Sequence, residues 1–368
     1  PEPDALPMGE LALEMPPDCD GIVTVGSGVI GDLGKMLARV SDKALVAVAT
    51  APSMDGFAST SASMLVRGVK TSVSTPCPAA ILGDTDILSQ APLRMLWAGL
   101  GDMLAKPGAL CEWRMAHLIV DEPYCPYVAD LVRSSLRTIL AAADGLAERR
   151  PEAIERVAEG LILAGVAMSY AGISRPASGT EHYLSHMWDM QALERHALPD
   201  LHGIQVGVAT RIALSLFDWS RDQTPDAGRA LSARAQAVQT YASDVQAWFG
   251  SAAPQILALE ARERKNDAQR HAHRLERILL HWPELLTILE EELAPVRDCA
   301  SLMRRLGMPM TPSDLSITPD NVRNALLGAR EIRDKYLWVS LLWDLGLLRE
   351  ATGHVLGMLE AESGRGAR

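Results

Sequence analysis

Three histidines close together in the sequence are its strongest chemical signal. His182 and His186 are four residues apart, so they fall on one face of a helix. Ser178 and Glu181 form the S-x-x-E pattern of a capping box, which predicts that this helix begins there. His202 follows just beyond the expected helix. Imidazole is a common metal ligand, although an isolated histidine pair is more often structural. The spacing therefore favours a metal or polar-substrate site.

A carboxylate that could complete such a site is Asp102, in the segment AGLGDMLAK. It directly follows Gly99 and Gly101 in an otherwise apolar helical pattern, where a buried charge has no packing reason. Two neutral imidazoles and one carboxylate would give a divalent metal three protein ligands and leave coordination positions open, as catalytic sites do. These ligand types suit zinc, nickel and iron alike, so the identity of the metal stays open.

A second chemical signal is the segment GSGVIG at 26–31, which follows an apolar run and opens a helical pattern. Glycines in this context let the backbone approach a pyrophosphate at a helix N-terminus. An ordinary tight turn is the alternative. The loop TAPSMDGFAS at 50–59 is longer than a plain connection of about 2–6 residues. Its polar residues are expected at the carboxyl end of a strand, where ligands bind.

These segments lie on two kinds of structure. Short apolar runs predict strands at 22–25, 44–50, 71–75 and 79–82, with a helix at 31–40 giving a βαβ unit. We therefore expect a partial, Rossmann-like α/β nucleotide-binding domain at 1–88 and an all-α domain at 89–368. The helical patterns of the second domain are 91–106, 127–148, 151–172, 180–197, 203–217, 226–248, 254–275, 283–305 and 332–347.

Composition narrows the functional classes. The 368 residues carry a net charge of -11 without a basic run, which argues against a nucleic-acid partner. The five cysteines are scattered, which fits a reducing compartment, so a cytoplasmic location is expected. The longest apolar stretch, 161–173, is shorter than the roughly 20 residues of a membrane span, and no signal peptide begins the sequence.

Taken together, five ordered motifs resemble the sn-glycerol-1-phosphate dehydrogenase family, within the iron-containing alcohol dehydrogenase and dehydroquinate synthase superfamily. A later segment, 329–348, resembles the C-terminal part of the longer bacterial members. The resemblance implies reduction of a small phosphorylated triose, dihydroxyacetone phosphate, by NAD(P)H with one divalent metal, zinc or nickel, with iron as a further option. The motifs are GSGVIGDLGK (26–35), TAPSMDGFAS (50–59), the run at 91–106, SGTEHYLSHMWDM (178–190) and HGIQVG (202–207).

The resemblance also implies roles for individual residues. The metal ligands would be Asp102, His182 and His202. Asp55, Asp102 and His186 would contact the substrate, and His186, one turn from a ligand, would orient it or relay a proton. The positions implied to contact the nicotinamide cofactor are Gly28, Val29, Ile30, Gly31, Asp32, Thr50, Ala51, Pro52, Ser53 and Ser59.

Several features depart from the family pattern. Ile204 stands where glutamate is commoner, so a polar contact beside His202 is expected to be missing. Pro107 and Glu112 are expected to shift the helix after Asp102. The strands that precede the glycine loop in the family have no counterpart in the sequence. We therefore also consider a related alcohol or polyol dehydrogenase with another small substrate, and a truncated, non-catalytic relic.

Some properties cannot be derived from the sequence. The residue that usually selects NAD or NADP ends a strand that has no counterpart here. Arg175 and Lys106 are near the motifs and could bind phosphate, but a solvent-exposed role is an equal alternative for both. The oligomeric state stays open, with a homo-oligomer as one option.

Overall fold

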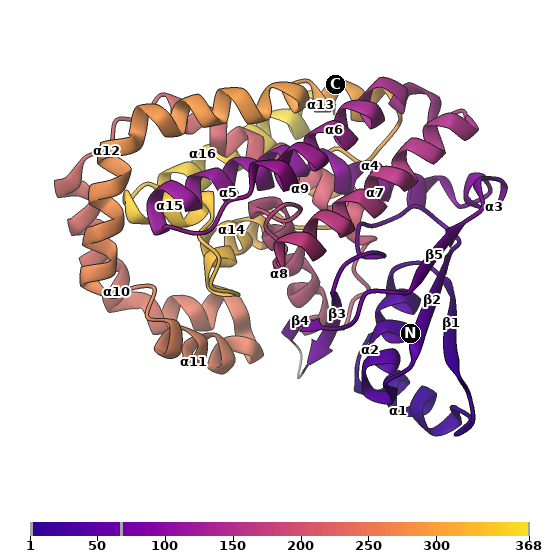
Figure 1. The fold of residues 1–368 in the computed structure, drawn as a ribbon. Helices are drawn as coiled ribbons and strands as arrows, with labels where there is room; N and C mark the ends of the chain where they lie inside the picture. Colours follow the sequence, from indigo (N-terminus) through magenta and orange to yellow (C-terminus); the bar gives the residue numbers. More distant parts are fainter. Residues whose placement is uncertain (1–2, 67–68, 367–368) are drawn as a thin grey trace.

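The computed structural model describes residues 3–66 and 69–366, and its strands lie in the N-terminal part of the chain (Figure 1). The helices that follow form a larger body, with α8 lying between this body and the strands. This arrangement confirms the expected α/β part followed by an all-α part. The boundary after residue 88 remains a prediction. No helix of the described residues is long and apolar enough to cross a membrane.

A three-stranded parallel sheet, ordered β1-β2-β5, carries the glycine loop. Helix α2 (Gly28–Ser41) connects β1 to β2, which confirms the predicted βαβ unit. Thr24 of β1 lies opposite Ala47 of β2, and both strands end at the edge from which the ligand loops leave. Helix α1 (Ala5–Glu14) packs against α2 and was not predicted. The strands are β1 (Gly21–Gly26), β2 (Ala44–Ala49) and β5 (Ala80–Gly83).

The expected strand at 71–75 does not belong to this sheet. It is β4 (Val69–Ser74), which pairs antiparallel with β3 (Ser61–Val66) in a separate two-stranded sheet. The sequence analysis missed β3, since its serine and alanine residues give little strand signal. Ala62 and Met64 on one face are buried against Leu33 of α2, so tertiary packing stabilises this hairpin.

The helical part differs from the prediction in its divisions. Patterns 254–275 and 283–305 are wrong, because one helix, α12, runs through Pro283 and its buried face continues from Ile278 to Leu285. Four of these helices were not predicted: α3, α5, α14 and α16. The predicted helix 332–347 is shorter in the structure, where α15 spans Trp338–Asp344. The helices are α3 (Thr85–Ser89), α4 (Leu93–Leu104), α5 (Lys106–Val120), α6 (Pro126–Ala142), α7 (Pro151–Ala171), α8 (Thr180–Glu194), α9 (His202–Arg221), α10 (Ala227–Phe249), α11 (Ala253–Glu263), α12 (Ala268–Leu293), α13 (Cys299–Arg305), α14 (Pro319–Gly328), α15 (Trp338–Asp344) and α16 (Leu348–Gly366).

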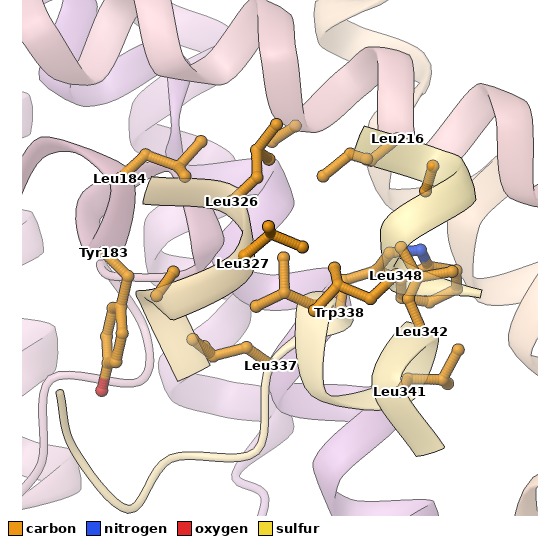
Figure 2. Packing of buried hydrophobic residues seen from close by; sticks show 14 of the residues in the cluster. Tyr183, Leu184, Leu216, Leu326, Leu327, Leu337, Trp338, Leu341, Leu342 and Leu348 are labelled. Atoms are coloured by element: carbon orange, nitrogen blue, oxygen red, sulfur yellow. The ribbon is translucent and has the colours of Figure 1, made fainter. Parts of the chain in front are cut away.

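The largest hydrophobic cluster joins α8 and α9 to the C-terminal helices. Trp338, at the start of α15, is fully buried and stands edge-on to Phe217 of α9 at 5.2 Å between ring centroids. Leucines of α14, α15 and α16 surround it (Figure 2). Burying each large apolar side chain contributes about 1.5–3 kcal/mol, so this cluster fixes the helices that carry the histidines.

Helices α4 and α9 cross in direct backbone contact. A Cβ atom added to Gly203 would lie 1.9 Å from the carbonyl oxygen of Ala98, and one added to Gly101 would lie 2.2 Å from that of Gly203. No side chain fits between two backbones at this separation. The contact places Asp102 of α4 beside His202 of α9. The glycines therefore determine whether these two side chains can bind the same metal ion.

We expect the Gly203→Ala substitution to lower the free energy of unfolding by at least about 3 kcal/mol, because the new methyl group overlaps backbone atoms that cannot move aside. Urea denaturation measures this change. The matched control is Gly228→Ala on the exposed face of α10, where the same substitution should stabilise the helix by up to about 1 kcal/mol. Equal effects at the two positions would contradict the packing argument.

Candidate functional site

The three expected metal ligands come together in the structure. The ligand atoms of Asp102, His182 and His202 all lie within 4.8 Å of one another. Asp102 Oδ1 is 3.2 Å from His182 Nε2, and the His182 and His202 rings are 5.3 Å apart. Two atoms bound tetrahedrally at about 2 Å from zinc lie roughly 3.3 Å apart, so the observed spacing fits a shared divalent ion.

His182 is oriented by its neighbour in the sequence. Its Nδ1 lies 3.0 Å from Glu181 Oε1, which leaves Nε2 facing Asp102. A carboxylate behind a histidine fixes the ring and makes the opposite nitrogen a better ligand. The predicted capping box is wrong about Ser178, which is not the N-cap residue. The N-cap is Gly179, whose N–H donates to Glu181, and the Ser178 side chain makes no cap hydrogen bond.

His202 is oriented through Ser185, which is fully buried. The Gln205 amide donates to Asp189, so its Oε1 is free to accept the Ser185 hydroxyl proton at 3.0 Å. Ser185 Oγ can then accept from His202 Nδ1, 3.2 Å away, which leaves Nε2 of this ring unprotonated for a metal. The expectation of a missing polar contact was wrong, because Ser185 supplies one although Ile204 is buried and apolar.

Lys106 is the buried cation of the site. It is fully buried and donates to the carboxylates of Asp55 and Asp102, the latter at 2.8 Å. Burial by itself would raise the pKa of Asp102, but Lys106 and His182 outweigh it and lower that pKa below its usual range. Burial and the nearby Asp102 raise the pKa of Asp55. The exposed alternative is excluded for Lys106, and also for Arg175, which is buried and bound by Glu122.

The helical segment that contains Asp102 is interrupted just before Pro107. Helix α4 ends at Leu104 and α5 begins at Lys106. Glu112 of α5 is fully buried and accepts hydrogen bonds from the backbone of Thr180 and of Trp338, at 2.9 Å each. Burial and the nearby Glu181 raise the pKa of Glu112 to about 7. This side chain therefore connects α5 to the first residues of both α8 and α15.

His186 stands beside the three candidate ligands. Its ring stacks on His202 at 5.6 Å, and its ligand atoms form a second group with those of Asp189 and His202 within 4.8 Å. Burial, together with nearby Arg333 and Lys70, holds the pKa of His186 well below its usual value, so the ring is neutral at neutral pH. Its Nδ1 has no hydrogen-bond partner among the described residues.

These groups open into a cleft of about 440 Å³ between the glycine loop and the helical part. Of the residues expected at the cofactor, Gly28, Val29, Asp32 and Ser59 line it, whereas Ile30, Gly31 and the segment 50–53 do not. Of the substrate candidates, Asp55 and His186 line it, whereas the fully buried Asp102 does not. The cleft walls also include Lys70, Asp189 and Arg333, which the sequence analysis did not single out. Asp189 lies within the motif 178–190 and Arg333 within the segment 329–348, whereas Lys70 lies outside the motifs.

The glycine loop has the expected strand-to-helix form. Strand β1 ends at Gly26, Ser27 is the N-cap and α2 begins at Gly28. The Ser27 and Ser53 hydroxyls are 2.5 Å apart, which connects this loop to the one after β2. Unpaired N–H groups at a helix N-terminus are suited to phosphate, so the loop has the form of a nucleotide site.

Comparison with known proteins first defines the class. A sequence model for iron-containing alcohol dehydrogenases matches residues 7–92. The fold resembles a probable glycerol dehydrogenase from Sinorhizobium meliloti, with a TM-score of 0.62 and 17% identity over 98% of this chain and 83% of that one. Glycerol dehydrogenase from Schizosaccharomyces pombe has a TM-score of 0.57 and 18% identity, over 98% of this chain and 76% of that one. The chain therefore has the fold of the iron-type alcohol dehydrogenases.

Sequence relatives then narrow the class to one family. The chain is 33% identical to glycerol-1-phosphate dehydrogenase [NAD(P)+] of Bacillus licheniformis, over 91% of this chain and 70% of that relative. It is 32% identical to the protein of the same name from Geobacillus stearothermophilus, over 88% and 71%. The chain belongs to the glycerol-1-phosphate dehydrogenase [NAD(P)+] family of oxidoreductases.

We expect Ser185→Ala to weaken metal affinity by about tenfold to a hundredfold, because His202 loses the partner that fixes its tautomer. Titration of the metal-free protein with zinc measures this. Ser135→Ala is the matched control, since that hydroxyl is buried in α6, remote from the site, and has no partner among the described residues. Unchanged zinc affinity in Ser185→Ala would contradict the proposed orientation.

Asp32 predicts a dependence of stability on pH. Burial outweighs Lys35 and raises the pKa of this carboxyl from 3.8 to about 6. Its charge therefore destabilises the folded state, and this cost develops as pH rises from below 3.8 to above 6. A pKa shift corresponds to about 1.4 kcal/mol per unit. Over this pH range the free energy of unfolding of Asp32→Asn should therefore rise by up to about 3 kcal/mol relative to that of wild type. Urea denaturation at pH 4 and pH 8 measures the gain.

The control for this measurement is Asp18→Asn, which replaces an exposed carboxyl group before β1. Its difference from wild type should change little between the two pH values. A difference between wild type and Asp32→Asn that is equal at pH 4 and pH 8 would show that the Asp32 pKa is not raised.

Proposed function

We propose that the protein reduces dihydroxyacetone phosphate to sn-glycerol 1-phosphate with NAD(P)H and one divalent metal. The observation that carries this proposal is the convergence of Asp102, His182 and His202, because both histidines line the cleft that the start of the glycine-loop helix also lines. The relatives that bear the name glycerol-1-phosphate dehydrogenase support the choice of substrate.

The donor set fits a catalytic metal. One carboxylate oxygen and two imidazole nitrogens leave coordination positions free for a substrate, and zinc, nickel and iron all accept such ligands. When bound, the metal would polarise the substrate carbonyl, while the nicotinamide cofactor supplies the hydride. Lys106 keeps Asp102 ionised, and Glu181 and Ser185 orient the two imidazoles. These contacts prepare the three ligands before any ion arrives.

Two further side chains would act on the substrate. His186 is neutral and has an unpartnered Nδ1, so it can hydrogen-bond the carbonyl oxygen of the substrate and relay the proton that this oxygen requires on reduction. Asp55 lines the cleft, and Lys106 holds its carboxylate in place to accept a hydrogen bond from the single hydroxyl of dihydroxyacetone phosphate. The role of His186 requires a correctly placed neutral imidazole and no positive charge, which agrees with its low pKa.

The cofactor would occupy the end of the cleft formed by the α/β part. We assign its phosphates to the N-terminus of α2, where Gly28, Val29 and Asp32 line the cleft. The loop 50–53 does not line the cleft, and Ser53 would support the glycine loop through its contact with Ser27. Ser59 would contribute from the next turn, although its hydroxyl also contacts Lys35 and the Gly56 carbonyl.

The experiment for this proposal measures metal content and NAD(P)H oxidation together. After chelation and reloading with zinc, nickel or iron, the protein should reduce dihydroxyacetone phosphate in preference to dihydroxyacetone or simple aldehydes. Asp102→Asn and His202→Ala should each lose bound metal and at least about a thousandfold in turnover, because several kcal/mol of carbonyl polarisation disappear.

His273→Ala is the matched control, because it removes an exposed imidazole from α12. It should keep both metal content and turnover. Full activity in either ligand variant would refute the metal assignment, and equal rates across the substrate panel would refute the choice of substrate.

A further inference from the structure

Three buried polar atoms without partners gather beside His186. They are His186 Nδ1, Tyr183 Oη and Arg333 Nη2, and none has a hydrogen-bond partner among the described residues. The Tyr183 and His186 rings are 6.3 Å apart, and the Arg333 guanidinium carbon lies 5.8 Å from the centre of the Tyr183 ring. An unsatisfied buried polar group costs about 1–3 kcal/mol, so three of them together indicate a missing ligand.

Tyr183 is fully buried at the edge of the large hydrophobic cluster, and its hydroxyl points away from the labelled leucines (Figure 2). Arg333 and His186 line the cleft, as do Ser174 and Ser178. Arg333 and His186 therefore face one part of the cleft, on the side formed by the segment before α15 and by α8. Tyr183 does not line the cleft itself but lies beside both side chains.

This corner has an excess of positive charge. Lys335 Nζ lies 6.0 Å from the centre of the Tyr183 ring and donates only to neutral oxygens, Ser174 Oγ at 2.6 Å and the Ser178 carbonyl at 3.3 Å. Within residues 3–66 and 69–366, neither Arg333 nor Lys335 forms an ion pair with a carboxylate. Burial, then Arg175 and Arg333, lower the pKa of Lys335 well below its usual value, so the permanent positive charge of this corner is the Arg333 guanidinium.

The other cations of the cleft region are already neutralised. Lys70 is paired with Asp189, Lys106 with Asp55 and Asp102, and Arg175 with Glu122. In this part of the chain the unpaired positive charge is therefore restricted to the corner beside Tyr183.

A neighbouring arginine shows what a purely structural role looks like. The Arg330 guanidinium stacks on Trp343 at 4.0 Å, and both of its terminal nitrogens are bonded, one to Glu331 and one to Asn266. Arg333 has the cation–π contact but leaves a terminal nitrogen unbonded. The difference is that Arg333 faces the cleft, where a ligand can supply the missing acceptor.

We propose that Arg333, assisted by Lys335 and the Tyr183 hydroxyl, binds the phosphoryl group of the substrate and so distinguishes a phosphorylated from an unphosphorylated triose. This rests on the proposed function. The planar guanidinium can donate two parallel hydrogen bonds to phosphate oxygens, and the phenol can donate a third. With His186 between this corner and the metal ligands, one end of a triose phosphate would be held while its carbonyl lies at the ligand cluster.

The experiment compares Arg333→Met and Arg333→Lys with wild type on the metal-loaded protein. Calorimetric Kd and steady-state KM are measured for dihydroxyacetone phosphate and for dihydroxyacetone, with inorganic phosphate as a competing probe. Arg333→Met should lower the affinity for dihydroxyacetone phosphate by about tenfold to a hundredfold, as expected for a lost charged hydrogen bond. The affinity for dihydroxyacetone should stay unchanged. Arg333→Lys should retain part of the affinity, because lysine keeps the positive charge but lacks the paired N–H donors of the guanidinium.

The matched control is Arg323→Met, which removes the same charge from an exposed position of α14 and should change neither ligand. Unchanged affinity for dihydroxyacetone phosphate in Arg333→Met, or equal losses for both ligands, would overturn the assignment. If wild type reduces neither triose, the proposed function fails; phosphate binding by wild type and its loss in Arg333→Met would still support the anion site. Thermal melts of each variant separate misfolding from loss of the site.

Discussion

The close contact between α4 and α9 is the constraint on which the site depends. Glycines on both helices let the backbones touch, and a single methyl group at Gly203 would overlap the Ala98 carbonyl. The residues that carry chemistry lie beside these glycines, with Asp102 next to Gly101 and His202 next to Gly203. The same small residues that allow the helices to approach therefore also bring a carboxylate and an imidazole within reach of one ion.

Charge is organised around this contact in two different ways. Beside the candidate metal ligands, the positive charge of Lys106 stabilises the carboxylates of Asp55 and Asp102, so these two groups are held in place without a metal ion. On the far side of His186, Arg333 and Lys335 lack an anionic partner among the described residues. A chain with a net charge of -11 thus presents local positive charge at one part of its cleft. Compensated cations hold the protein's own groups, whereas uncompensated ones are available to a ligand.

Periodicity identified much of the fold, and its failures have physical causes. The βαβ unit around the glycine loop was predicted because its strands are apolar and its helix has a buried face. Strand β3 was missed because alanine and serine favour no strand, and only packing on α2 stabilises it. Helix α12 continues through Pro283 because residues on both sides of the proline pack into the same core. Tertiary contacts offset the one hydrogen bond that proline removes.

The sequence by itself determined the residue types of the site, because metal ligands and glycine loops need particular side chains at particular spacings. This reasoning predicts Asp102, His182 and His202 as a ligand set. Only the tertiary structure decided that Lys106 is buried between two carboxylates, that Ser185 orients His202, and that Arg333 lies beside Tyr183. The reason is distance along the chain. A spacing of three or four residues fixes neighbours on one helix, whereas contacts between residues 17, 51 or 150 positions apart depend on how the helices and loops pack.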